Sequence, residues 1–157
     1  MTIPDTHQDT VVFSANALTK LILDQSIYLG EIARIYIGTE SAIDSSKPIS
    51  SFLIALMEEK FGENTLAQCD VVDFTFACIR GVDALQNCID FIKLNPAKKA
   101  IVVTTDFAKY DLNSSGEYTQ GAGALAMLVS SNPRIIAFEN NWATSTKGVF
   151  DFFKPFH

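Results

Sequence analysis

Residues 71–94, VVDFTFACIRGVDALQNCIDFIKL, constrain the fold of this chain more than any other stretch. Residues 71–76 are β-branched or aromatic apart from Asp73, a composition that predicts a buried strand. The apolar residues that follow recur at helical spacing, at Val82, Leu85, Ile89 and Ile92. The stretch therefore predicts a strand, a tight turn and a helix.

Cys78 lies in the turn between this strand and this helix. Near a helix N-terminus, the positive end of the dipole and the free N–H groups favour a thiolate and can stabilise an oxyanion. This placement suits a nucleophile, although a free cysteine is more often a small buried hydrophobic residue. Cys78 is therefore a candidate nucleophile, with a structural cysteine as the alternative.

Shorter segments on both sides of this unit predict further helices and strands. A helix is expected at residues 9–23, with Asp5 or Thr6 as candidate N-cap, and a second from Ser45 or Ser46, with Pro48 in its first turn, to Gly62. Strands are expected at residues 34–38, 99–105, 120–129 and 134–138, with mostly loop at 106–118. This alternation implies an α/β fold with a mostly parallel sheet and helices on both faces.

Three chemically reactive residues, Glu40, Cys78 and Asp106, each follow the carboxyl end of a predicted strand. Ligands of parallel sheets bind beyond these carboxyl ends, and a carboxylate near a thiol can act as a general base. Glu40 or Asp44 taken alone is more often a helix cap or a solvated charge. The three positions together predict a site at this edge of the sheet.

Gly121 and Gly123 interrupt the apolar strand expected at residues 120–129. Glycines in a strand permit close backbone approach, with simple packing as the alternative. They do not form a phosphate-binding loop, because GxGxxG is absent and no helix follows.

Composition limits the classes of function. The 157 residues, 48% of them hydrophobic, suggest a single domain over residues 1–157. A net charge of −6 without a Lys or Arg cluster argues against nucleic-acid binding, and no apolar run reaches the roughly 18 residues of a membrane span. Three cysteines without metal-ligand spacing, and histidines only at His7 and His157, argue against a metal site or a disulfide scaffold. We expect a cytoplasmic protein without signal peptide, metal or cofactor.

Five segments, in this order, resemble those of 3-hydroxy-3-methylglutaryl-CoA synthases. IGTESAIDSSK, residues 37–47, resembles the segment with the general acid/base glutamate, and FAC at 76–78 with Gly81 resembles the nucleophile segment. TTDFAKY at 104–110 is similar to the aspartate-containing strand end. YTQGAGALAML at 118–128 resembles the TQGAGA segment almost letter for letter, and FDFFKP at 150–155 is similar to a short aromatic segment. The resemblance covers nearly the whole chain.

The resemblance implies a thiolase-like fold and a Claisen-type condensation of acetyl-CoA with acetoacetyl-CoA, as in the mevalonate pathway of isoprenoid biosynthesis. Cys78 would accept the acetyl group, Glu40 would deprotonate its methyl carbon, and Asp44 and Asp106 would support the site. The substrates would be acyl groups on coenzyme A or on an acyl carrier protein.

The chain departs from the family pattern in three ways. Ile79 and Arg80 follow Cys78, where the family has tyrosine; Arg80 could lower the thiol pKa, bind a coenzyme A phosphate or lie on the surface. The family's first strand, expected at the centre of the sheet, has no counterpart, which predicts unpaired strand edges. The catalytic histidine and the second thiolase half have none either, because His157 comes too early. We therefore expect an incomplete N-terminal half that forms a homodimer or binds a chain carrying the second half.

Other functions remain open. A catalytically silent assembly or regulatory subunit would account for the missing tyrosine and the missing half. A synthase of polyketide β-branching would retain the same chemistry. A ketoacyl synthase III is disfavoured, because those enzymes rely on downstream His and Asn rather than on a residue like Glu40.

Overall fold

The computed structural model describes residues 2–75, 78–139 and 141–150. Its middle layer is a four-stranded sheet in the order β2-β1-β3-β4. The strands are β1 (Ile32–Gly38), β2 (Asp70–Phe74), β3 (Lys99–Ala108) and β4 (Gly121–Val129). β1 is parallel to β2 and β3, and β4 is antiparallel to β3, so the sheet is mostly parallel as predicted.

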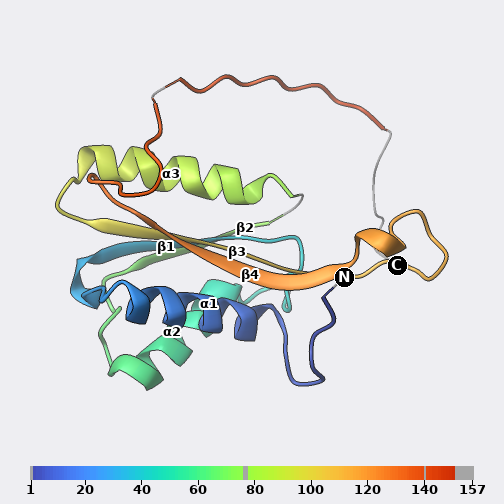
Figure 1. Ribbon diagram of the computed structural model, residues 1–157, viewed down its shortest axis with the longest axis horizontal. Coiled ribbons are helices and arrows are strands. Elements are labelled where there is room, and N and C mark those ends of the chain that lie inside the picture. The colour runs from blue at the N-terminus through green and yellow to red at the C-terminus, as the bar shows by residue number, and fades with distance from the viewer. Residues whose placement is uncertain (1, 76–77, 140, 151–157) are drawn as a thin grey trace.

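Helices cover both faces of this sheet (Figure 1). α1 (Thr10–Asp24) and α2 (Ile49–Phe61) lie on one face, and α3 (Arg80–Leu94) lies on the other. Alternation along β1 separates two apolar clusters, because Ile35 and Ile37 pack toward α1 and α2 while Tyr36 packs toward α3. The predicted α/β architecture with helices on both faces is confirmed.

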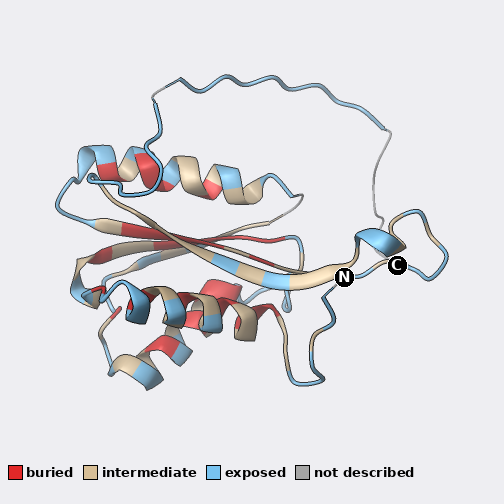
Figure 2. Cartoon of the chain, viewed as in Figure 1, coloured by how far each residue is buried: buried red, intermediate tan, exposed pale blue. Residues whose placement is uncertain are grey.

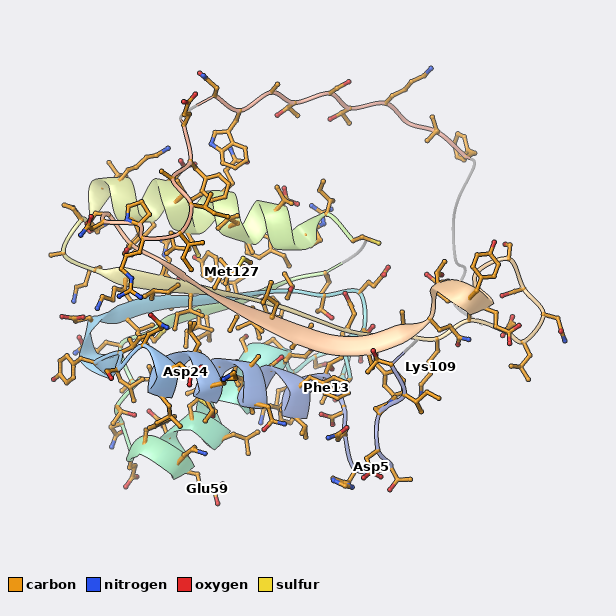
Figure 3. All side chains as sticks on the ribbon, viewed as in Figure 1. Asp5, Phe13, Asp24, Glu59, Lys109 and Met127 are labelled. Atoms are coloured by element: carbon orange, nitrogen blue, oxygen red, sulfur yellow. The ribbon has the colours of Figure 1, made fainter. Side chains whose placement is uncertain are left out.

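β3 forms the centre of the core. Residues 100–103 have no exposed surface, and Figure 2 shows this buried centre between the helical layers. Each fully buried Val or Ile contributes about 1.5–3 kcal/mol to stability relative to an exposed side chain. On β4, Met127 packs into the cluster that faces α3, in the position labelled in Figure 3. Burial on both faces explains why β3 reads as a continuous apolar run.

The helix ends are capped differently from the sequence-based prediction. Asp9, rather than Asp5 or Thr6, is the N-cap of α1, and its side chain accepts a hydrogen bond of 2.9 Å from the Val12 N–H. Pro48 occupies the N-cap position of α2 and has no capping side chain. Gly62, with φ +120°, ends α2 as predicted.

Asp73 of β2 caps α2 in place of Pro48. Its two carboxylate oxygens accept hydrogen bonds from the N–H groups of Ile49 (2.6 Å) and Ser50 (3.0 Å). A negative charge on the first N–H groups of a helix is stabilised by the helix dipole. This contact explains the acidic residue in the middle of the strand and fixes α2 to β2.

Several predicted boundaries are wrong. β2 is a half-exposed edge strand rather than a buried one, and Val72 remains 38% exposed. β3 continues to Ala108, so Asp106 lies in a strand and not in the loop. Residues 134–138 form no strand; the segment is irregular. Two short 3₁₀ segments, Leu29–Glu31 and Glu117–Thr119, complete the elements of the described residues.

The sheet has no central gap. All four strands pair consecutively, with β1 directly beside β3, and the unpaired outer edges are those of β2 and β4. No helix in the described part of the chain is long and apolar enough to cross a membrane.

Candidate active site

Parallel pairing brings the carboxyl ends of β1, β2 and β3 to one edge of the sheet. Glu40 lies two residues beyond β1, and Cys78 lies four residues beyond β2 and two before α3. The Cys78 Sγ donates a hydrogen bond to the Glu40 Oε1 at 3.5 Å. The structure thus brings together the thiol and the carboxylate that the sequence singled out, both exposed at this edge.

Two glycines allow this approach. A Cβ on Gly38, the last residue of β1, would lie 2.4 Å from the backbone nitrogen of Gly81 in the first turn of α3. A Cβ on Gly81 would in turn lie 2.5 Å from the Thr104 Cγ2 of β3. The start of α3 therefore packs directly on the backbone of β1, which places Cys78 beside the segment that follows β1.

Asp106 fixes the backbone of Glu40. Its Oδ1 accepts hydrogen bonds from the Glu40 N–H (2.7 Å) and from the Thr39 hydroxyl (3.2 Å). The Thr39 N–H donates to the Phe74 carbonyl at 3.0 Å, which ties the same segment to the end of β2. Asp106 therefore holds the main chain of Glu40 while the Glu40 side chain extends to Cys78.

The charges around Cys78 favour a protonated thiol. The pKa of Cys78 is raised first by the negative charge of Glu40 and then by the hydrogen bond to it, with smaller contributions from burial and from Asp106. This shift is opposite to the thiolate expected near a helix N-terminus, because the Glu40 carboxylate lies beside the thiol. The resting pair is a thiol that donates to a carboxylate, and Glu40 is placed to take its proton.

The other acidic and basic candidates serve their own segments. Asp44 accepts hydrogen bonds from the Ser46 and Lys47 N–H groups, both at 2.7 Å, and these bonds lower the pKa of its carboxyl group. Arg80 forms an ion pair of 2.8 Å with Asp83 in the first turn of α3. These contacts do not involve the Cys78 thiol. The roles of Asp44 and Arg80 in the site therefore stay predictions.

Gly121 and Gly123 border the site without close packing. A Cβ on either would meet no atom of the described structure within 4 Å, so the predicted close backbone approach is wrong within this chain. Both line a shallow cavity of about 330 Å³ that Thr104 and Asp106 also line. The two glycines therefore leave space beside Asp106, along the strand β4.

The remaining cysteines are not candidates for nucleophilic attack. Burial raises the pKa of Cys69 and that of Cys88 to about 12. Among the described residues, no group of three or more His, Cys, Asp and Glu side chains could hold a metal ion.

Sequence reasoning missed the polar residues behind the site. Thr39 and Thr105 are buried, with 2% and 1% of their surface exposed, and both hydroxyls are hydrogen-bonded. The sequence feature that could have identified them is a polar residue near the end of an otherwise apolar strand.

This chain is similar to known proteins of one family. A family model described as hydroxymethylglutaryl-coenzyme A synthase N terminal matches residues 1–134. The chain is 39% identical over 155 residues to the hydroxymethylglutaryl-CoA synthase of Enterococcus faecalis, across 99% of this chain and 38% of that protein. It therefore spans less than two fifths of that relative's length.

Solved structures show the same relationship. The crystal structure of an HMG-CoA synthase complexed with CoA superposes with a TM-score of 0.83 and 26% identity, over 94% of this chain and 36% of that one. The HMG synthase of the curacin biosynthetic pathway in complex with holo donor-ACP gives 0.67 and 28%, over 84% and 32%. The sheet and helices described above are thus a thiolase-like fold. The chain belongs to the hydroxymethylglutaryl-CoA synthase family.

Proposed function

We propose that this chain carries the acylation half of an HMG-CoA-synthase-type condensation, with Cys78 as the acetyl acceptor. The observation that carries this proposal is the 3.5 Å contact between the Cys78 thiol and the Glu40 carboxylate at the carboxyl edge of the sheet. Geometry comes before pKa in assigning a general base, and Glu40 lies within reach of the proton it would remove.

In the first step, one proton passes from Cys78 through Glu40 to the departing coenzyme A. Glu40 takes the Cys78 proton, the sulfur attacks the thioester carbonyl of acetyl-CoA, and a new C–S bond forms as the bond to the coenzyme A sulfur breaks. Protonated Glu40 then returns its proton to the departing coenzyme A thiolate. The products are acetyl-Cys78, free coenzyme A and an ionised Glu40.

In the second step, the same carboxylate removes a proton from carbon instead of sulfur. A thioester acidifies the adjacent methyl group, so Glu40 can remove a methyl proton from acetyl-Cys78 and generate an enolate. The enolate carbon attacks the ketone of acetoacetyl-CoA, and protonated Glu40 returns its proton to the alkoxide that forms. Water then adds to the thioester carbonyl and the bond to the Cys78 sulfur breaks, which releases a carboxylic acid and restores the Cys78 thiol. Asp106 keeps Glu40 in place throughout by binding its backbone N–H.

We further propose acyl-coenzyme A as the donor and an acyl carrier protein as the alternative. CoA and a donor acyl carrier protein are named in the two solved structures above. A donor on a carrier protein would place the chain in polyketide β-branching; a coenzyme A donor would place it in the mevalonate pathway.

A companion completes the proposed site. The chain spans 38% of its Enterococcus faecalis relative, so we propose that it forms a homodimer or binds a chain carrying the second half, and that such a chain supplies the histidine of the condensation step. The three cysteines are free, which agrees with a reducing compartment such as the cytoplasm.

Intact-mass spectrometry tests the acylation step. The full chain incubated with acetyl-CoA should gain one acetyl group, and Cys78→Ala should gain none. Cys69→Ala is the matched control and should be acetylated like the wild type, because burial keeps Cys69 protonated. An unmodified wild-type chain, or an adduct that persists in Cys78→Ala, would contradict the proposal.

A catalytically silent assembly subunit is the second candidate. The raised pKa of Cys78 favours it, since fewer thiolates are present at neutral pH. This candidate predicts a stable complex with a chain carrying the second half and no acetyl adduct with either donor.

A further inference from the structure

Ser41, the residue after Glu40, makes three hydrogen bonds, one within its own segment and one each to β3 and α1. Its N–H donates to the Thr39 Oγ1 (3.0 Å), and its Oγ accepts from the Phe107 N–H of β3 (3.1 Å). Its carbonyl oxygen accepts from the Thr10 hydroxyl at the first residue of α1 (3.2 Å). The segment that carries Glu40 is therefore held from behind by α1 as well as by β3.

Thr10 is itself fixed in a buried polar network. It is 1% exposed, and its carbonyl accepts hydrogen bonds from the hydroxyls of Thr105 (3.0 Å) and Ser14 (2.7 Å). The N-terminal end of α1 lies at the same end of the molecule as the carboxyl ends of β1 and β3 (Figure 1). Fully satisfied buried networks restrict the groups they join to one arrangement.

We propose that Thr10 is a positioning residue for Glu40: its hydroxyl holds the Ser41 carbonyl against α1 and so keeps the Glu40 carboxylate in contact with Cys78. A residue in this role needs a hydroxyl and not merely the right volume. Valine would fill the same space, but the Ser41 carbonyl would lose its donor, and the segment would lose the contact with α1 that helps to hold it beside Cys78. The inference rests on the proposed role of Glu40 as the base for Cys78.

The measurement is the pH dependence of Cys78 alkylation by iodoacetamide in the full chain, read by peptide mass mapping so that Cys69 and Cys88 are followed separately. The charged groups that act on the Cys78 thiol are Glu40, from the segment after β1, and Asp106, from β3. In Thr10→Val the carboxylate withdraws, so alkylation should reach half its maximal rate at a lower pH than in the wild type. Acetylation by acetyl-CoA should slow by about three- to tenfold, the effect of one lost hydrogen bond.

Two control variants separate positioning from general stability. Thr10→Ser keeps the hydroxyl and should restore the wild-type alkylation profile. Ser14→Ala removes a hydroxyl that donates to the Thr10 carbonyl but makes no contact with Ser41. This variant should leave the alkylation profile unchanged. If Thr10→Val does not fold, Thr10→Ala, which also lacks the hydroxyl that donates to the Ser41 carbonyl, should shift the profile in the same direction.

The inference is overturned if Thr10→Val has the wild-type profile while Glu40→Gln does not, or if Ser14→Ala shifts it as much as Thr10→Val. It is also overturned if folded Thr10→Ala, used in place of an unfolded Thr10→Val, matches the wild type. The wild-type chain could fail to take up an acetyl group while Thr10→Val still shifts the alkylation profile. That result would refute the proposed function and leave the positioning role intact.

Discussion

At the scale of single residues, the site depends on three acidic or thiol groups with different tasks. Cys78 presents a thiol, Glu40 lies next to it as proton acceptor, and Asp106 holds the Glu40 backbone. Asp106 contributes little to the pKa of Cys78 compared with Glu40. Its task is therefore geometric more than electrostatic.

Replacing Asp106 should separate these tasks. Asp106→Ala leaves the Glu40 N–H and the Thr39 hydroxyl without their acceptor, which should lower the free energy of unfolding by about 1–3 kcal/mol. Asp106→Asn retains an acceptor oxygen and should lose less. Urea unfolding of both variants checks the order, and equal losses would show that the acceptor oxygen is not what matters.

The sequence could predict which residues gather at the site but not their protonation. Glu40 and Cys78 come just after strands, and parallel strands end at a common edge, so spacing alone brings them together. The raised pKa of Cys78 could not be predicted, because it depends on the 3.5 Å approach of one side-chain oxygen. The position of a residue near a helix start points to the opposite shift.

At the scale of elements, the contact between β1 and α3 determines the site. Gly38 and Gly81 let the helix start lie on the strand backbone, and the turn that carries Cys78 follows from that contact. A larger residue at Gly38 cannot be accommodated by a side-chain rotation, since its Cβ would meet the backbone of α3.

Gly38→Ala should therefore destabilise the fold by about 1–3 kcal/mol, the usual cost of overpacking. Gly123→Ala is the matched control, because it is also a glycine in a strand but its Cβ would meet nothing within 4 Å. That control should be neutral, or more stable by about 0.5–1 kcal/mol. Thermal unfolding compares the two, and equal effects would contradict the packing contact.

The cap on α2 gives a second test at this scale. Asp73→Ala removes the acceptor of the Ile49 and Ser50 N–H groups and should cost about 0.5–2 kcal/mol, whereas Asp73→Asn should retain part of the cap. Denaturant unfolding with circular dichroism measures the difference. An Ala variant as stable as the wild type would show that Asp73 does not cap α2.

Elements with strong periodicity could be predicted, and elements that depend on tertiary contacts could not. The α3 helix and the β3 strand carry clear apolar patterns and occur where expected. Residues 134–138 are as apolar as a strand but pair with no strand of the described structure. Asp73 is the one acid in the apolar run at residues 71–76, but its partner Ile49 lies 24 residues away in the chain, so the contact could not be predicted.

At the scale of the whole molecule, the face of the sheet under α3 buries two ionisable groups. Cys88 and Tyr36 lie in the cluster under α3, and burial is the first cause of the pKa of about 12 that each has. Both groups are neutral in the folded protein over the physiological range. The strand order that brings them together, with β1 between β2 and β3, could not be predicted, because pairing joins segments distant in the chain.

These raised pKa values predict a fold that weakens in alkali. Below pH 9 the Cys88 thiol is protonated in both folded and unfolded chains, so it adds no pH dependence. Between about pH 9 and 12 only the unfolded chain ionises, so stability should fall by up to about 1.4 kcal/mol per pH unit for this group. Cys88→Ala should flatten that slope in urea unfolding series, and an unchanged slope would contradict it.

The central claim is that Cys78 and Glu40 form a proton-sharing pair, and the pH profile of Cys78 alkylation in the wild type and in Glu40→Gln tests it most directly. The pair predicts a wild-type midpoint above that of an ordinary cysteine and a lower midpoint in Glu40→Gln, because removing the negative charge favours the thiolate. A wild-type midpoint at or below the ordinary value, or the same midpoint in both proteins, would contradict the pair.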